Sequence, residues 1–155
     1  MRPALSRCII ASKLARMSDN VFRWDCRVSY AECTMGNHVY YSRYLDVLER
    51  ARGEFFRHLG KPLVALQQED VTFPVLECQL KYHAPARYDD LLTIEIRVTT
   101  AKGARLGFYH RILAHDCRCL VECETLHVSA SIEEKPKRLP KELVELLSPY
   151  LRAAE

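Results

Sequence analysis

A short segment of the sequence gathers side chains that can carry out acyl-transfer chemistry. Glu32 supplies a carboxylate, Thr34 a hydroxyl and His38 an imidazole, all within a few residues of one another. Groups of these types activate water as general bases or attack an acyl carbon as nucleophiles. The sequence therefore predicts a reactive centre in segment 30–45.

The same segment leads into a long amphipathic helix, which the spacing of apolar residues predicts from about residue 38 to about residue 59. Gly60 and Pro62 are typical of the end of such a helix. The first N–H groups of a helix lack acceptors and lie at the positive end of its dipole, so they would stabilise an oxyanion. The alternative is that Thr34 or Asn37 only caps the helix.

Side-chain alternation separates the candidates around Thr34. In an extended backbone Glu32 and Thr34 project to one side and Cys33 to the other, which makes Cys33 the weaker candidate for a nucleophile. Thr34 is a poor base, and the sequence shows no obvious activating histidine arranged beside it. Asn37 is interpreted as a cap of the helix or as a residue that orients a catalytic water.

The elements that must position this segment are mostly strands. Alternating apolar and polar residues predict one strand in 21–30, before the segment. Runs of β-branched, aromatic and aliphatic residues predict four more strands after the helix, in 71–82, 91–100, 105–115 and 117–132. A short helix is predicted in 141–151. This order predicts an α+β fold, in which an antiparallel sheet packs against one central helix.

Composition and charge exclude several classes of protein. The 155 residues are 48% hydrophobic and 28% charged, as in one ordinary globular domain. No apolar run approaches the roughly 20 residues of a membrane-spanning helix. The net charge is +3, but four cations precede the first acid, Asp19, so the chain after Met17 has a net charge of −1. The body of the chain lacks the basic excess expected of a nucleic-acid-binding protein.

The N-terminal residues and the cysteines bear on processing and location. Residues 1–17 are basic and contain no acid, and we interpret them as a disordered extension or an early start codon, with a presequence as the alternative. Residues 18–155 are then a single domain.

The seven cysteines match no disulfide framework. Cys117, Cys119 and Cys123 share strand parity, but C-x2-C spacing is absent, so we expect no metal site and reduced thiols in the cytoplasm.

Three separated motifs carry a resemblance to a known family. The first is an acidic turn followed by Gly36, Val39, Tyr40, Tyr41, Ser42, Arg43-Tyr44-Leu45, Glu49 and Ala51-Arg52. The second comprises Tyr82, Pro85, Ala86, Tyr88, Asp89-Asp90 and Leu92, and the third Lys135-Pro136, Arg138 and Leu139-Pro140. Together they resemble the hotdog-fold acyl-CoA thioesterases, in the branch of the 4-hydroxybenzoyl-CoA and long-chain acyl-CoA enzymes. The resemblance covers nearly all of 22–140.

The resemblance implies a hotdog fold, with five or six antiparallel strands wrapped around one long central helix. It implies hydrolysis of an acyl-CoA or acyl carrier protein thioester to a free acid and a thiol, with no cofactor besides the coenzyme A of the substrate. Family members are homodimers, often assembled into homotetramers, with active sites at the subunit interface. Pairing of subunits would also cover an exposed sheet edge.

The resemblance assigns roles in the candidate centre, with one departure. Where the family carries the aspartate that attacks the thioester or activates water, this sequence has Thr34. We therefore predict that Glu32 acts as general base or nucleophile and that Thr34 positions water, while His38 assists or binds substrate. The N–H groups from Val39 to Tyr41 are predicted to polarise the thioester carbonyl, which places Tyr41 in the catalytic set.

Further residues are expected to bind substrate. Asn37, Val39 and Tyr40 lie beside the predicted catalytic residues. Lys102 and Arg105 flank a glycine turn and are candidates for contacts with coenzyme A phosphates, although they are also interpreted as solvated hairpin charges.

A second function fits the same fold. The missing aspartate favours a binding module that holds acyl-CoA or acyl carrier protein without hydrolysing it. Release of free thiol from acyl-CoA distinguishes the enzyme from the binding module.

Overall fold

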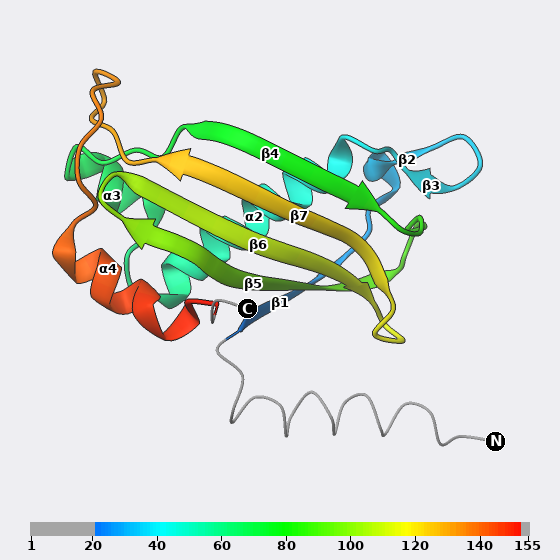
Figure 1. Ribbon diagram of the computed structural model, residues 1–155. Helices are drawn as coiled ribbons and strands as arrows, with labels where there is room; N and C mark the ends of the chain where they lie inside the picture. The colour runs from blue at the N-terminus through cyan, green and yellow to red at the C-terminus, as the bar shows by residue number, and fades with distance from the viewer. Residues whose placement is uncertain (1–20, 153–155) are drawn as a thin grey trace.

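The computed structural model describes residues 21–152, so the predicted extension in 1–17 lies outside the described residues. A curved sheet wraps around one long helix, with shorter helices beside it (Figure 1). The elements in chain order are β1 (Phe22–Arg27), η1 (Tyr30–Glu32), β2 (Cys33–Thr34), β3 (His38–Val39), α2 (Arg43–His58), α3 (Leu63–Gln68), β4 (Val75–Tyr82), β5 (Leu91–Lys102), β6 (Arg105–Ala114), β7 (Cys119–Val128), α4 (Lys141–Leu147) and η2 (Ser148–Tyr150).

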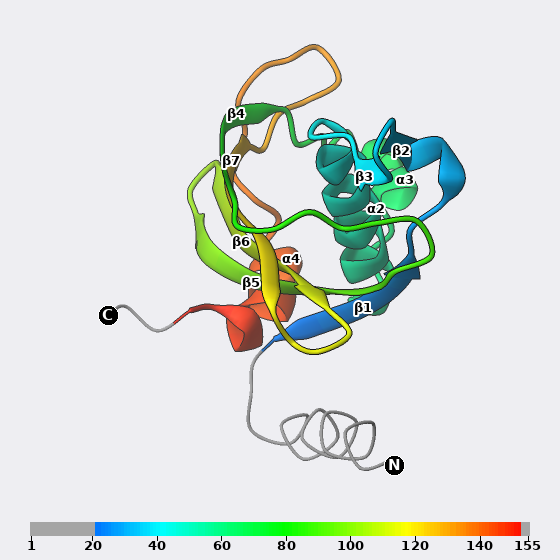
Figure 2. The same cartoon turned by 90° about the vertical axis from the view of Figure 1, so that its right-hand side faces the viewer.

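The main sheet has five antiparallel strands in the order β1-β5-β6-β7-β4. Figure 2 shows the sheet curving around α2. Alternation along β5 buries Leu92, Ile94, Ile96 and Val98, because successive side chains of a strand point to opposite faces. The structure therefore confirms the predicted α+β fold, with an antiparallel sheet around a central helix.

Helix α2 supplies the other half of the core. Its buried side chains recur at helical spacing: Tyr44, Val47, Leu48, Ala51, Phe55 and Phe56. The predicted end is confirmed, because Gly60 has a φ of +74° just beyond the helix. The predicted start at about residue 38 is wrong. Gly36 and Asn37 have φ values of +85° and +58°, so the chain reverses there into a hairpin before the helix can begin.

Strand β4 forms one edge of the sheet and is exposed along most of its length, a bare edge that no other element in residues 21–152 covers. Seven of its eight residues are exposed. They include Val75, Leu76 and Tyr82, which expose 53%, 54% and 49% of their surfaces. An edge strand also offers unpaired backbone groups to another strand. Among the described residues, no helix is both long enough and apolar enough to cross a membrane.

Candidate active site

Strands β2 and β3 form a small hairpin beside the N-terminus of α2 (Figures 1 and 2). The N–H of Asn37 donates to the carbonyl of Thr34 at 3.2 Å and closes the turn. The side-chain Oδ1 of Asn37 accepts a hydrogen bond from the N–H of Tyr88 at 3.0 Å, which ties the turn to the loop before β5. The interpretation of Thr34 or Asn37 as the helix cap is therefore wrong, since Ser42 occupies that position.

The hairpin register places His38 directly opposite Thr34. Residues opposite each other in an antiparallel pair project to the same face, with Cβ atoms about 5 Å apart. Both residues are exposed. Sequence reasoning found no histidine beside Thr34, although a Gly-Asn pair between the two residues is a signal for a hairpin turn. The structure thus puts an imidazole beside a hydroxyl at a place open to water.

Glu32 lies in the 3-10 helix η1 and not in the extended backbone that was expected. Its Oε2 accepts hydrogen bonds from the N–H and the hydroxyl of Ser29, at 2.6 and 2.9 Å. Its Oε1 accepts one from Arg50 of α2 at 2.7 Å. The Glu32 side chain is only 12% exposed. These contacts fasten the turn to α2, whereas a general base needs a lone pair directed at its water.

The backbone N–H groups before α2 divide into used and unused donors. Those of Val39 and Tyr40 donate to backbone carbonyls at 2.9 and 3.0 Å, which corrects the prediction that they polarise a substrate carbonyl. The N–H groups of Tyr41 and Ser42 have no acceptor among the described residues. No side chain caps this helix. Two donors at the positive end of α2 are therefore left for a ligand.

Two hydrogen bonds set the directions of these unused donors. The hydroxyl of Tyr82 donates to the carbonyl of Tyr41 at 3.1 Å, and the N–H of Arg43 donates to the carbonyl of Tyr40 at 2.8 Å. In a trans peptide the C=O and the next N–H point in opposite directions. The first bond therefore orients the N–H of Ser42 and the second that of Tyr41. Donors held in this way before substrate arrives suit an oxyanion hole.

Aromatic residues beside these donors differ in their roles. The rings of Tyr40 and Tyr41 lie 4.6 Å apart. They are 47% and 61% exposed, so they offer an apolar surface to a ligand. Phe55 and Phe56, further along α2, are fully buried and belong to the core.

The thiols nearest the hairpin do not form a reactive or metal-binding group. The Sγ of Cys33 lies 3.7 Å from the carbonyl oxygen of Ser29, and the side chain packs against the core. Strand alternation turns it away from Thr34. Within residues 21–152, no three or more His, Cys, Asp and Glu side chains come together in a way that could hold a metal ion.

Lys102 and Arg105 lie at the other end of the sheet from the hairpin. They face each other across the turn between β5 and β6. The hairpin follows β1, whose end pairs with the opposite end of β5, at Leu91. Because β5 has 12 residues, the two ends are about 35 Å apart. Within one chain, the structure does not bring these cations to the predicted catalytic residues.

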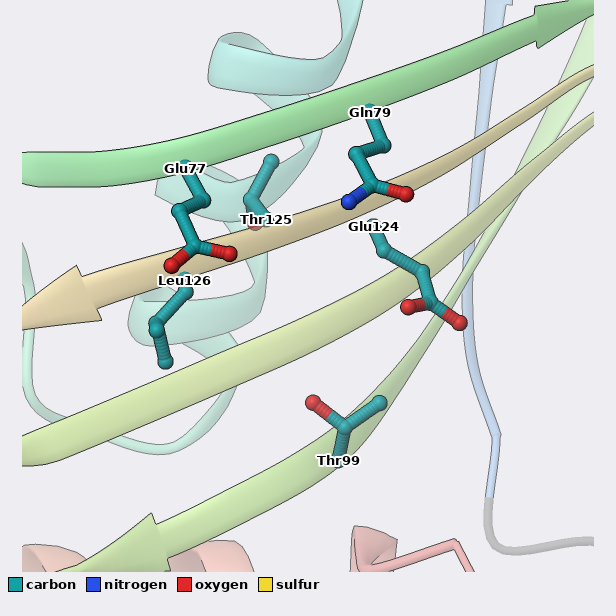
Figure 3. Close-up of a pocket in the computed structure, with 6 residues that line it drawn as sticks. All are labelled: Glu77, Gln79, Thr99, Glu124, Thr125 and Leu126. Carbon is teal, nitrogen blue, oxygen red and sulfur yellow. The ribbon is translucent and has the colours of Figure 1, made fainter.

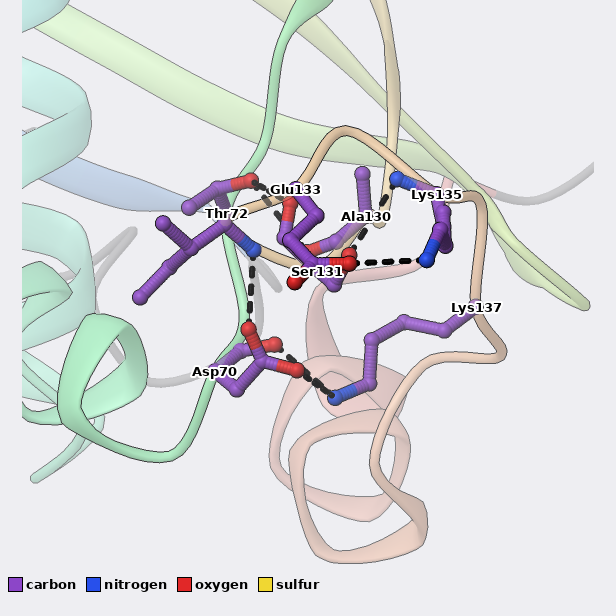
Figure 4. Close-up of polar contacts among 8 residues, drawn as sticks. Asp70, Thr72, Ala130, Ser131, Glu133, Lys135 and Lys137 are labelled. Carbon is purple, nitrogen blue, oxygen red and sulfur yellow. Dashed lines mark hydrogen bonds and ion pairs between the residues drawn. The ribbon is translucent and has the colours of Figure 1, made fainter.

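Two hollows in the described surface also lie away from the hairpin. One of about 190 Å³ opens on the outer face of the sheet, where polar side chains of β4, β5 and β7 project (Figure 3). The other, of about 670 Å³, is formed by the loop 131–137, which the ammonium of Lys137 ties to Asp70 at 3.3 Å (Figure 4). Neither hollow is lined by hairpin residues, so neither accounts for a thioester site.

Known proteins resemble this chain in both sequence and structure. A family model, the thioesterase-like superfamily, matches residues 28–147. The acyl-CoA thioester hydrolase YbgC of Escherichia coli O6:H1 is 39% identical over 129 residues, which cover 83% of this chain and 96% of the relative. The crystal structure of a probable thioesterase from Bartonella henselae is 32% identical, with a TM-score of 0.73, and covers 77% of this chain and 99% of that chain. A mutant 4-hydroxybenzoyl-CoA thioesterase complexed with 4-hydroxybenzoyl-CoA shares the fold, with 20% identity, a TM-score of 0.76 and coverage of 83% and 99%.

Proposed function

We propose, because the chain belongs to the thioesterase-like superfamily, that it hydrolyses acyl-CoA thioesters to free acids and coenzyme A. The observation that carries this proposal is the pair of unused N–H donors at Tyr41 and Ser42, next to the paired residues Thr34 and His38. The donors suit an oxyanion, and the imidazole suits activation of water. That the reaction takes place in the cytoplasm stays a prediction.

The proposed mechanism uses His38 as the general base. Its imidazole takes a proton from water while the water oxygen attacks the thioester carbon, and the hydroxyl of Thr34 orients that water. The N–H groups of Tyr41 and Ser42 stabilise the oxyanion of the tetrahedral intermediate. The C–S bond then breaks, and the proton returns from the imidazolium to the thiolate of coenzyme A. No protein-bound intermediate is needed.

Glu32 is the second candidate for the base, since it is the carboxylate nearest to Thr34 along the chain. Its hydrogen bonds to Ser29 and Arg50 favour a structural role in holding the turn. We therefore favour His38 over Glu32 as the general base.

The activity itself is tested by mixing the purified protein with aliphatic and aromatic acyl-CoAs and a thiol-detecting reagent. We expect thiol release well above the uncatalysed rate for at least one acyl-CoA. Saturable binding of acyl-CoA without release would instead support the non-hydrolytic binding module. The same assay with acyl carrier protein thioesters tests the alternative carrier.

We also propose that two chains form a homodimer through β4. The bare edge and the exposed Val75, Leu76 and Tyr82 support antiparallel pairing of two β4 strands. Such pairing places the Val75 end of one strand beside the Tyr82 end of the other, where the Tyr82 hydroxyl contacts the candidate oxyanion hole. The β5–β6 turn of the second chain comes to that end too, since β4 and β5 run in opposite directions. Assembly of dimers into a tetramer stays a prediction.

Leu76→Lys is expected to weaken dimerisation about 100-fold, because pairing at β4 would bury an unpaired ammonium. Sedimentation velocity over a range of protein concentrations measures this effect, and thiol release at the same concentrations reports the activity. Val64→Lys is the matched control, because Val64 lies on α3 and is also exposed, at 62%. A Leu76→Lys protein that dimerises like the unmodified chain would contradict pairing through β4.

A further inference from the structure

Two thiols are in contact near the bare edge of the sheet. Cys78 on β4 and Cys123 on β7 are free cysteines, and their Sγ atoms lie 3.7 Å apart. The register places Cys78 opposite Thr125 and Cys123 opposite Leu80, so the two thiols are diagonal neighbours on one face of the sheet. That face is the inner one, because Cys123 belongs to the hydrophobic core.

The two thiols differ in their access to water. Cys78 is exposed, whereas Cys123 is buried. Burial raises the pKa of the Cys123 thiol to about 12, so Cys123 is protonated at physiological pH. The thiolate is the form of cysteine that reacts with oxidants, and water reaches the sulfur at Cys78 to solvate it. Cys78 is therefore suited to react first and Cys123 to react second.

A cation lies close enough to act on both thiols. Burial lowers the pKa of Arg52 on α2, and the charges that Glu49, Cys123 and Cys78 carry when ionised oppose this effect. The charge of Arg52 in turn opposes the effect of burial on Cys123. Positive charge beside a thiol is a common feature of cysteines that react with oxidants. The pair thus combines sulfur contact, access to water at one thiol and a neighbouring guanidinium.

We propose that hydrogen peroxide oxidises Cys78 and Cys123 to a disulfide within one chain, and that this bond slows thioester hydrolysis. The Cys78 thiolate attacks one peroxide oxygen, so an S–O bond forms, the O–O bond breaks and hydroxide leaves. The Cys123 thiol then attacks the sulfur of this sulfenic acid. The S–S bond forms, the S–O bond breaks, and the hydroxyl leaves with the thiol proton as water. Two thiols and one peroxide give one disulfide and two waters.

The effect on hydrolysis rests on the proposed thioesterase function and on the position of Tyr82. Tyr82 follows Cys78 by four residues on β4, so the two side chains project to the same face. Burial raises the pKa of Tyr82, and the neighbouring thiols add to this effect. The hydroxyl of Tyr82 donates to the carbonyl of Tyr41 at 3.1 Å, in the peptide that presents the N–H of Ser42. The thiol pair therefore lies beside a contact that holds the candidate oxyanion hole.

Formation of the disulfide must draw β4 and β7 together. Diagonal neighbours have Cα atoms about 7 to 8 Å apart, whereas ordinary disulfides join Cα atoms up to about 6.8 Å apart. The sulfur atoms must also approach from 3.7 Å to a bond length of about 2 Å. Within one chain, β7 is held by strands on both sides and β4 by β7 alone, so β4 moves. This movement carries Tyr82 away from Tyr41 and misaligns the N–H of Ser42.

Peptide mapping tests the bond without any need for catalysis. The purified protein is treated with hydrogen peroxide, the remaining thiols are blocked with iodoacetamide, and tryptic peptides are analysed by mass spectrometry without reduction. We expect a link between peptides 58–81 and 119–137, which dithiothreitol breaks. The second peptide contains Cys119 as well as Cys123. The link should therefore persist in Cys119→Ser, the matched control, and disappear in Cys123→Ser.

Cys78→Ser covers the case in which Cys123→Ser does not fold, because Cys78 is exposed. This variant should also lack the link. Absence of the link in the unmodified protein, or its survival in either variant of the pair, would overturn the disulfide. A covalent dimer on a non-reducing gel in place of the link within one chain would overturn it too.

Hydrolysis is measured in the same samples after catalase has removed the peroxide, by chromatography of the remaining acyl-CoA. We expect kcat to fall about 10-fold on oxidation, as small displacements in an active site permit, and to recover with dithiothreitol. Cys78→Ser should show no change on treatment with peroxide. Unchanged kcat in the linked protein refutes the effect on hydrolysis and keeps the disulfide. Absence of hydrolysis in both the reduced and the linked protein refutes the proposed function, and with it the effect on hydrolysis, but again keeps the disulfide.

Discussion

Replacement of His38 by glutamine is expected to lower kcat for acyl-CoA hydrolysis by about 100-fold to 1,000-fold, the usual effect of losing a general base. Glutamine keeps hydrogen-bonding groups at the position opposite Thr34, so the hairpin should survive. The exposed imidazole has no structural partner in the hydrogen-bond network of the described residues. Thermal unfolding of the variant should therefore match that of the unmodified protein, while steady-state thiol release falls.

Glu32→Gln is the matched variant for this experiment. It removes the charge that Arg50 and Ser29 contact, so it should lower the free energy of unfolding by about 1 kcal/mol and change kcat much less than His38→Gln does. The kcat of Thr34→Ala should lie between those of the other two variants, because the substitution removes only the group that orients water. If Glu32→Gln loses all hydrolysis at unchanged stability while His38→Gln stays active, Glu32 is the base and the assignment to His38 is wrong.

Acid is expected to destabilise the fold well before most carboxylates are protonated. Burial lowers the pKa of His110 from 6.5 to about 3 and that of His127 from 6.5 to about 4. Both imidazoles are neutral in the folded chain but bind protons in the unfolded chain below pH 6.5. The contribution of the two imidazoles to the stability of the fold is thus fully present above pH 6.5 and is lost as pH falls toward these folded-state pKa values. Two such groups together lower the free energy of unfolding by about 5 kcal/mol between pH 6.5 and pH 4.5.

Urea unfolding at pH 7 and at pH 4.5 measures this loss. The charge of Arg52 on α2 acts on both rings, and the backbone carbonyl oxygens of Cys123 and Phe73 face His110 and His127 respectively. A His110→Leu variant should show a smaller difference between the two pH values, since it removes one of the two titrating rings. An equally steep dependence in that variant would assign the acid sensitivity to other groups.

Periodicity predicted the framework of this fold because the burial of apolar side chains follows local spacing. The stripe on α2 and the alternation on β5 are properties of neighbouring residues, and both appear as expected in the core. The start of α2 was missed because two consecutive left-handed residues, Gly36 and Asn37, redirect the chain. Left-handed backbone angles prevent a helix even where the apolar spacing is helical. In the sequence they are indicated only by the residue types Gly and Asn.

The candidate site was harder to predict because its contacts join residues that are distant along the chain. Glu32 was expected to reach the substrate, yet its partner Arg50 lies 18 residues away and fixes it elsewhere. His38 is proposed as the base because the hairpin register places it opposite Thr34, and that register depends on the turn. Arg52 and His127 are 75 residues apart, and no pattern in the sequence pairs them. Long-range partners of polar groups decide which side chains remain available for chemistry.

The hydrogen bond from Tyr82 to the carbonyl of Tyr41 joins the bare edge strand to the peptide that presents the N–H of Ser42. The proposed pairing of subunits at β4 and the proposed oxyanion hole therefore share one structural link. Dilution below the dissociation constant of the dimer would then act as inhibition, and raised protein concentration as activation. In that case the amount of enzyme in a cell would set its specific activity as well as its total activity.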